Sequence, residues 1–260
     1  MFVNTFLTLN MDFFTNWVIL GCAIIILMNK TKKFFILGTI LFFVSIIFTF
    51  LIKNFDVGLA GDTNTLVGFS GFNSAVFHTF GVNFLLYKIT ELAGFLPLLL
   101  AAAYAIIGLV QLLKRKSLKK VNRGLLVFGE FLICVFITYI LFDKLALNFR
   151  PVLIDGELEP SFPSSHTMLS LCICFGAIFL NMFDFKKYHF TKFLNVALAL
   201  LAIFITTGRF LSGVHWATDI IGGVLFAATF LTFYLSVLSK NPPRSPLPNQ
   251  EANAKIKTNN

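Results

Sequence analysis

Long uninterrupted apolar runs make up most of the chain, and short polar or basic stretches separate them. A helix needs about 20 apolar residues to cross the hydrocarbon core of a bilayer, with about 17 to 25 as the working range. Seven runs approach this length, and we expect each to form a membrane-spanning helix: 13–28, 34–52, 92–113, 125–142, 167–183, 193–207 and 220–238. The pattern predicts an all-α integral membrane protein, built as a multi-span helical bundle.

The composition excludes an ordinary soluble domain. Hydrophobic residues make up 57% of the 260 residues and charged residues only 13%, and the mean hydropathy is +0.83. Residues 1–12 lack the basic start of a signal peptide, so we expect the first apolar run to remain in the mature protein. The four cysteines all fall within apolar runs, which favours small buried thiols over a disulfide framework or a metal cage.

The chain divides into three parts by its pattern. We expect residues 1–32 to form an extra N-terminal span and residues 33–239 to form a six-span core. Residues 240–260 are polar and rich in Pro and Asn, and we expect a disordered cytoplasmic tail. Between the second and third spans, the stretch 72–87 (FNSAVFHTFGVNFLLY) has the pattern of an amphipathic helix that lies along the membrane interface.

The basic residues predict the orientation, because Lys and Arg are enriched in cytoplasmic loops. If seven spans leave the C-terminus in the cytoplasm, all but five of the 21 Lys and Arg residues lie on the cytoplasmic side. The five are Lys53, Lys88, Lys144, Arg150 and Arg209. The net charge of +9 therefore mainly reflects topology, whereas the last three cations need another explanation.

Three polar stretches lie at the outer ends of predicted spans. They are KLALNFRP (Lys144–Pro151), PSSHT (Pro163–Thr167) and GRFLSGVHWATD (Gly208–Asp219). Ionisable groups in or beside a bilayer are costly and mark function by default. We therefore expect these stretches to meet in one site.

Part of this chemistry is suited to a phosphate group. The guanidinium groups of Arg150 and Arg209 can each bind phosphate oxygens with two hydrogen bonds, and Lys144 can add a point charge. Ser164 and Ser165 resemble the start of a helix, whose free N–H groups and positive dipole end attract an anion. No carboxylate cluster accompanies them, so we expect neither a metal ion nor another cofactor.

The remaining groups are suited to phosphoryl transfer. His166 and His215 have side chains that titrate near neutrality, which serves proton transfer or nucleophilic attack. Asp219 follows His215 by four residues, and on a helix the carboxylate can hold the tautomer of the imidazole and stabilise its cation. An anion cradle with two histidines, one of them braced by a carboxylate, describes transfer through a phosphohistidine.

These stretches resemble the motifs of the membrane-bound type 2 phosphatidic acid phosphatases, also called lipid phosphate phosphatases, which share their site with the vanadium haloperoxidases. The family pattern is Lys, six residues, Arg-Pro; then Pro-Ser-Gly-His; then Ser-Arg, five residues, His, three residues, Asp. The chain matches the spacing of the third motif with Arg209, His215 and Asp219, and it carries Arg150 and His166 of the other two. The resemblance implies a six-helix phosphatase core, to which the first span is an addition.

The chain departs from the family pattern at three positions. Only five residues separate Lys144 from Arg150, which on a helix rotates the lysine by about 100°. Ser165 stands where the family has glycine, and Gly208 stands where it has serine. One backbone approach is therefore crowded and one hydroxyl contact is lost, while both histidines, both arginines and the aspartate remain.

The resemblance also implies a role for each residue. The catalytic residues would be the nucleophile His215, its orienting partner Asp219 and His166, the acid that protonates the leaving oxygen. The phosphate would be held by Lys144, Arg150 and Arg209, with the amides of Ser164 and Ser165. We assign only packing roles to His78 and His189.

We therefore expect a metal-independent phosphatase of the plasma membrane that acts on the extracytoplasmic face. Its partners would be the bilayer and a lipid with a phosphate monoester or pyrophosphate, and not nucleic acid. Undecaprenyl pyrophosphate is the preferred substrate, ahead of phosphatidic acid, phosphatidylglycerol phosphate and lipid A phosphate. Two alternatives stay open: a phosphotransferase that uses the same phosphohistidine, and an anion transporter with Glu91 and Glu130 as coupling groups.

Overall fold

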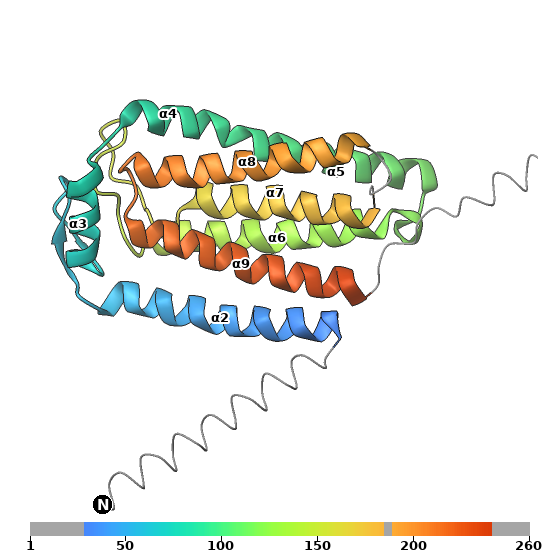
Figure 1. Cartoon of the computed structure of the whole chain (residues 1–260), viewed down its shortest axis with the longest axis horizontal. Coiled ribbons are helices and arrows are strands. Elements are labelled where there is room, and N and C mark those ends of the chain that lie inside the picture. The colour runs from blue at the N-terminus through green and yellow to red at the C-terminus, as the bar shows by residue number, and fades with distance from the viewer. Residues whose placement is uncertain (1–28, 185–188, 241–260) are drawn as a thin grey trace, which may run out of the picture.

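Six membrane-length helices form a bundle in the computed structural model, which describes residues 29–184 and 189–240 (Figure 1). Within these residues the spans are α2 (Lys30–Asn54), α4 with α5 (Phe84–Ala93 and Phe95–Arg115), α6 (Arg123–Leu145), α7 (Ser165–Asp184), α8 (His189–Leu211) and α9 (Ala217–Lys240). The prediction of an all-α multi-span bundle is confirmed. The predicted span 13–28 and the predicted tail from 241 onward lie outside the described residues, so the division into three parts stays a prediction.

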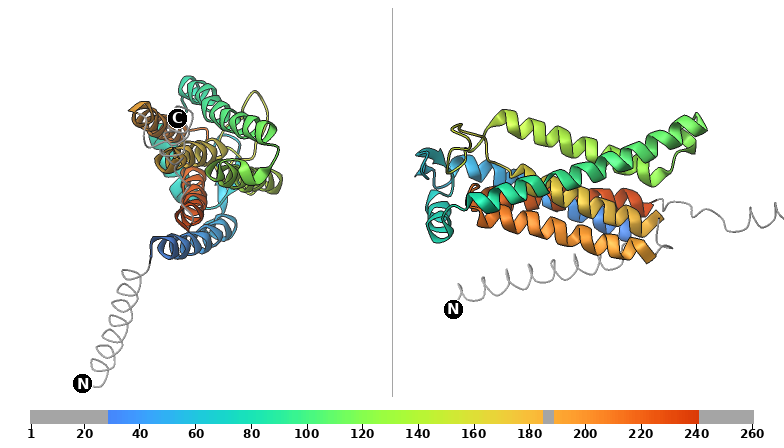
Figure 2. Two further views of the ribbon diagram at one scale, coloured as in Figure 1. Left: turned by 90° about the vertical axis from the view of Figure 1, so that its right-hand side faces the viewer. Right: turned by 90° about the horizontal axis from the view of Figure 1, so that it is seen from above.

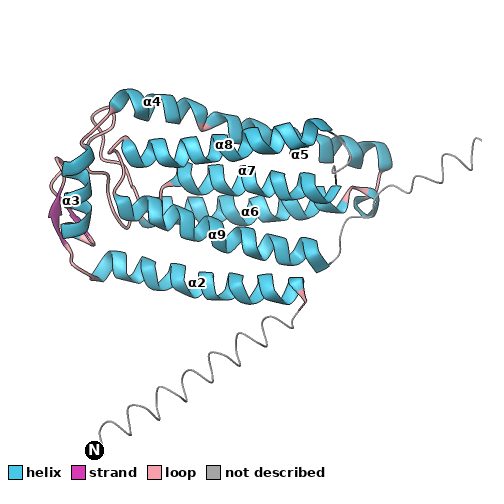
Figure 3. Ribbon diagram, in the orientation of Figure 1, coloured by secondary structure: helices cyan, strands magenta, loops and turns pink. Residues whose placement is uncertain are grey.

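Smaller elements close one end of the bundle. The strands β1 (Gly58–Ala60) and β2 (Thr65–Val67) form an antiparallel hairpin, and α3 (Ser70–Phe80) follows it (Figure 3). The single interfacial helix expected over 72–87 is wrong, because the stretch contains the end of α3, a turn and the start of α4. Gly81 has a positive φ of 64°, which ends α3, and the Asn83 side chain caps α4 by accepting the Leu86 N–H at 2.9 Å. At the opposite end, the short η1 helix (Leu118–Lys120) joins α5 to α6.

The helix α7 occupies the middle of the bundle (Figure 2). In its most apolar stretch 61% of the residues are buried, against 11% to 44% in the other five spans. Close packing on α6 is possible because Gly176 has no side chain: a Cβ there would lie 2.8 Å from Cε2 of Phe128. The rings of Phe128, Phe131 and Tyr234 fill the adjoining core. α7 is therefore the most enclosed of the six described spans.

Polar side chains join the helices inside this apolar bundle. Ser45 Oγ and Thr229 Oγ1 lie 3.1 Å apart between α2 and α9. Tyr104 donates to Asn181 Oδ1 at 2.6 Å, and Asn181 in turn donates to Asn195 Oδ1 at 2.9 Å, which connects α5, α7 and α8. Such bonds between membrane helices are worth about 0.6 kcal/mol each on average. Their main effect is to fix which helix faces pair.

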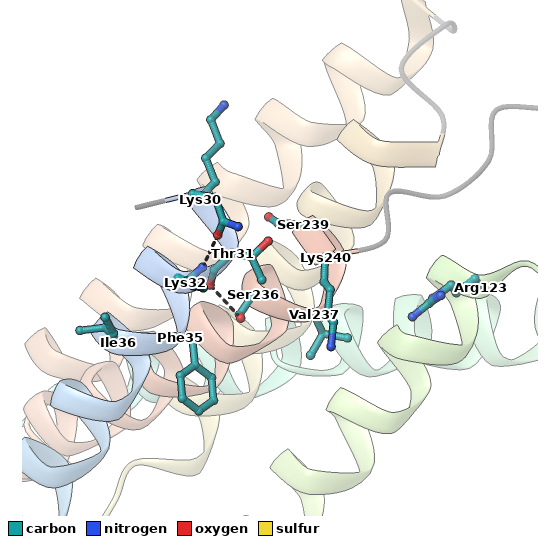
Figure 4. Close-up of a pocket in the computed structure, with 11 residues that line it drawn as sticks. Lys30, Thr31, Lys32, Phe35, Ile36, Arg123, Ser236, Val237, Ser239 and Lys240 are labelled. Carbon is teal, nitrogen blue, oxygen red and sulfur yellow. Dashed lines mark hydrogen bonds between the residues drawn. The ribbon is translucent and has the colours of Figure 1, made fainter. Parts of the chain in front are cut away.

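The end of the bundle away from α3 is basic. A cavity of about 1050 Å³ lies there, where α2 begins and α9 ends. Among the residues that line this cavity, Ser236 donates its Oγ hydrogen to the Thr31 carbonyl at 3.0 Å. Lys240 and Arg123 also line it (Figure 4). The basic segment 114–123 lies at the same end. The charge separation that predicts a cytoplasmic orientation is therefore a separation between the two ends of the folded bundle.

The loop between α8 and α9 docks against the turn between α3 and α4. The Asn83 N–H donates to the Ser212 carbonyl at 2.9 Å. Gly213 has a φ of 67°, and a Cβ there would lie 1.9 Å from the Gly81 carbonyl oxygen. Only glycine meets both conditions, so the position of this loop depends on Gly213.

Gly213→Ala is expected to destabilise the protein by about 2 to 4 kcal/mol, because it adds both left-handed backbone strain and a steric clash. The measurement is the thermal unfolding midpoint in detergent. Gly108→Ala is the control, since a Cβ at Gly108 meets nothing within 4 Å. Equal midpoints for the two variants would contradict the assigned role of Gly213.

Candidate active site

Two loops meet at the end of the bundle that α3 covers (Figure 1). One joins α6 to α7 (residues 146–164), and the other joins α8 to α9 (residues 212–216). Trp216 Nε1 donates to the Phe149 carbonyl at 2.7 Å, and the Ser164 N–H donates to the Asp219 carbonyl at 3.0 Å. These two bonds tie the three polar stretches of the sequence to one another.

His215 and Asp219 form a buried pair. Nδ1 of His215 lies 3.6 Å from Oδ2 of Asp219, and the same oxygen accepts the Trp216 N–H at 2.9 Å. Asp219 therefore caps the start of α9 as it faces the imidazole. Nε2 of His215 is buried and has no hydrogen-bond partner among the described residues. With Nδ1 directed to the carboxylate, Nε2 is the nitrogen left for chemistry.

The imidazole of His215 is held in its neutral form. Burial is the largest cause, followed by the positive charges of Arg150 and Arg209 and by His166, and together they hold the pKa of His215 well below its usual value. An uncharged imidazole has a free lone pair at neutral pH, as a nucleophile requires.

Two buried guanidinium groups stand beside this pair. Arg150 Nε lies 3.0 Å from Oε2 of Glu159, while Nη1 of Arg150 has no hydrogen-bond partner. Arg209 is 0% exposed, and Nε, Nη1 and Nη2 all lack a hydrogen-bond partner among the described residues. Buried donors without partners are rare and call for a specific explanation. An anion at this position supplies one.

The start of α7 differs from expectation in one respect. The Ser164 carbonyl accepts the Met168 N–H at 3.0 Å, so Ser164 does occupy the cap of the helix. The Ser164 N–H, however, is not free for phosphate, because it donates to Asp219. The group that remains is the Ser164 hydroxyl, which is buried without a partner. Ser165 and His166 follow directly, in the first turn of α7.

His166 borders a cavity of about 200 Å³ between α5, α6 and α7. Its wall is mainly apolar, and the polar residues in its lining are Glu91, Tyr139, Ser165, His166 and Ser170. The ring packs on the break between α4 and α5, where a Cβ on Gly94 would lie 2.6 Å from Cδ2 of His166. A much smaller cavity, about 30 Å³, lies beside His215. The lining of these cavities includes Ser165, His166, Tyr139, Leu169, Phe95, Ser161 and His215.

Lys144 is the predicted site residue that the structure does not bring into the cluster. It lies in the last turn of α6, its side chain is exposed, and it lines neither cavity. Conversely, three residues near the site were not predicted from the sequence: Tyr87, Asn148 and Ser161. Asn148 Nδ2 and Ser161 Oγ are buried without hydrogen-bond partners, and Tyr87 contacts both arginines. Asn148 lies inside one of the polar stretches, but Tyr87 comes from an apolar segment that carries no such signal.

The described residues hold no group of three or more His, Cys, Asp or Glu side chains that could bind a metal ion. The charges that face a bound anion therefore come from the arginines and from the start of α7. The side chains brought together are those of Arg150, Ser164, His166, Arg209, His215 and Asp219.

Part of the chain is similar to known proteins. Residues 131–243 match the sequence profile of the PAP2 superfamily, a range that includes both histidines, both arginines and Asp219. No curated protein matches the chain. A crystal structure of the first transmembrane PAP2-type phosphatidylglycerolphosphate phosphatase, from Bacillus subtilis, is similar, with 22% sequence identity, a TM-score of 0.49 and coverage of 78% of this chain and 94% of that one. The part of the chain that carries the candidate site, residues 131–243, is therefore similar to the PAP2 superfamily.

Proposed function

We propose that the protein is an integral membrane lipid phosphate phosphatase that works through a phosphohistidine. One observation carries the proposal: buried guanidinium donors without partners stand beside a buried, neutral histidine whose Nε2 is unoccupied. The guanidinium N–H groups would bind a phosphate group, and Nε2 of the histidine would attack its phosphorus atom. The side chains assigned to the phosphate are Arg150, Arg209 and the hydroxyl of Ser164.

In the first step, Nε2 of His215 attacks phosphorus. The N–P bond forms as the bond from phosphorus to the lipid oxygen breaks, and His166 gives its proton to that oxygen. Asp219 stabilises the positive charge that develops on the imidazole. The arginines neutralise the charge on the equatorial oxygens, which is the main contribution to catalysis in phosphoryl transfer.

In the second step, water attacks the phosphohistidine. His166, now neutral, takes a proton from the water, the N–P bond breaks, and inorganic phosphate leaves. Both histidines return to their starting states, so no proton or electron is gained or lost over the cycle. No step requires a bound metal ion, because the arginines supply the positive charge.

The apolar cavity beside His166 supports a lipid substrate. His166 is assigned to the leaving oxygen, so the alcohol that departs lies on this side of the phosphorus atom. The cavity is lined by Phe95, Leu98, Phe136 and Leu169, which suits a hydrocarbon chain better than a sugar or a nucleoside. α5 and α6, which form two of its walls, carry the lipid-exposed residues of this face of the bundle.

We favour an extracytoplasmic site and undecaprenyl pyrophosphate as substrate, ahead of phosphatidic acid, phosphatidylglycerol phosphate and lipid A phosphate. The orientation is supported by the basic residues at the opposite end of the bundle. An outward-facing site would reach lipid phosphates of the outer leaflet.

His215→Gln is expected to reduce phosphate release by about 10⁴-fold or more, because the nucleophile is lost. The measurement is release of inorganic phosphate from a lipid phosphate in detergent, together with trapping of the phosphorylated protein from a ³²P-labelled substrate. His78→Gln is the matched control, since His78 is exposed on α3. Retained turnover in His215→Gln would exclude the phosphohistidine mechanism.

A panel of lipid phosphates is expected to show the highest kcat/KM for undecaprenyl pyrophosphate, and activity that EDTA does not change. Each lipid is assayed with and without chelator, and with a labelled phosphate group and added alcohol or sugar acceptors. Transfer of label to an acceptor in preference to water would favour a phosphotransferase. Substrate flux in proteoliposomes without turnover would favour a transporter.

A further inference from the structure

The compensation of charge differs between the two buried arginines. Arg150 has a carboxylate partner, Glu159, at 3.0 Å. Arg209 is the more deeply buried of the two, yet no carboxylate within the described residues lies within 4 Å of its guanidinium group. A buried charge without a partner is strongly destabilising. An interaction other than an ion pair must therefore stabilise the charge of Arg209.

The ring of Tyr87 lies against both guanidinium groups. Cζ of Arg209 is 4.7 Å from the ring centroid, and Cζ of Arg150 is 5.9 Å from it. Tyr87 is itself only 5% exposed, and its hydroxyl donates to Oε1 of Glu91 at 3.1 Å. Both distances lie within the range in which the negative face of an aromatic ring attracts a cation. A hydroxyl that donates to a carboxylate also makes the ring richer in electrons, which strengthens that attraction.

An aromatic face has an advantage over a carboxylate at this position. A carboxylate on Arg209 would accept two of its N–H groups and would compete with phosphate for the same donors. The ring attracts the charge through its face and leaves the N–H groups in the guanidinium plane free, as they are found here. The buried cation is thus stabilised without loss of its capacity to bind an anion.

The packing of α4 on α8 explains how Tyr87 reaches this place. Thr90, one turn further along α4, lies against Gly208, where an added Cβ would be 2.4 Å from Cγ2 of Thr90. The missing side chain at Gly208 therefore permits a close approach of the two helices directly beside Arg209. The Thr90 hydroxyl is turned back onto its own helix, where it bonds the Leu86 and Tyr87 carbonyls at 2.9 and 3.0 Å.

We infer that Tyr87, supported by Glu91, is a positioning residue that holds Arg209 and Arg150 ready for the phosphate group. Tyr87 acts through the arginines and does not itself touch the reacting atoms. The inference rests on the proposed function in one respect only, namely that the anion held by these arginines is the phosphate of the substrate.

Tyr87→Leu is expected to weaken the binding of orthovanadate, a phosphate mimic, by about 10- to 30-fold and to raise KM similarly, because a desolvated cation–π contact is lost. Tyr87→Phe keeps the ring and should stay within about 3-fold of the natural protein. Glu91→Gln should also cause a change of only about 3-fold. The measurements are the vanadate inhibition constant, KM and kcat.

Tyr104→Leu is the matched control. Tyr104 is buried to a similar extent, at 8% exposed, and its hydroxyl also donates to a side chain, that of Asn181 on α7, but it lies in the α5–α7–α8 network away from the arginines. The Tyr104→Leu variant should have a lower thermal unfolding midpoint, with KM and the vanadate inhibition constant unchanged. Equal effects of Tyr104→Leu and Tyr87→Leu on vanadate binding would overturn the inference, since both would then be general packing effects.

A series of fluorinated phenylalanines at position 87 tests the same point. These substitutions keep the ring and therefore leave no cavity behind. Phenylalanine, difluorophenylalanine and trifluorophenylalanine at position 87 keep the shape of the ring while its negative face becomes weaker. The vanadate constant should rise with each step, and a constant that is independent of fluorine number would overturn the inference. Vanadate binding is also followed by thermal shift, so a protein that binds vanadate in this graded way but hydrolyses no lipid phosphate would refute the proposed function and leave the role of Tyr87 intact.

Discussion

The burial of two guanidinium charges at one end of an apolar bundle is the constraint on which the site depends. Transfer of an unpaired charge from water to such a place costs several kcal/mol even after relaxation. Glu159 meets part of this cost for Arg150, and the Tyr87 ring meets part of it for Arg209. What remains within the described residues is a set of unsatisfied N–H donors, which in the proposed function bind the phosphate group. A site stabilised completely from within would have no such capacity.

The rest of the fold keeps these charges beside the proposed nucleophile. α7 is enclosed by its neighbours, so its first turn has a fixed position, and α8 and α9 bring Arg209 and His215 to the same end. Two loop bonds, from Trp216 to Phe149 and from Ser164 to Asp219, then set the loops against each other. Asp219 links helix and chemistry, because one carboxylate oxygen both caps α9 and faces the imidazole. Preorganisation of this kind lets the charges act without rearrangement during the reaction.

The sequence predicts the spans well because the bilayer imposes one simple rule, an apolar run of sufficient length. The pairing of His215 with Asp219 is also accessible, since it depends on a spacing of only four residues, although His215 lies in the loop before α9 and not in the helical turn that the sequence suggests. Contacts between segments far apart in the sequence cannot be predicted from spacing or hydropathy in this way. Nothing in the apolar stretch around Tyr87 indicates that its ring lies on Arg209. That contact depends on the lack of a side chain at Gly208, more than a hundred residues later, which lets α4 and α8 approach closely. The hydrogen bond from the Ser164 amide to Asp219 has the same origin, because it joins two distant segments. The exposed position of Lys144 on α6, in contrast, agrees with the shortened spacing between Lys144 and Arg150.

The most direct measurement is an experimental structure of the protein with bound orthovanadate. The account predicts vanadium within bonding distance of Nε2 of His215, its equatorial oxygens in contact with Arg150 and Arg209, and its other axial oxygen beside His166. Vanadate bound at another place, or at this end of the bundle without contact to His215, would contradict it.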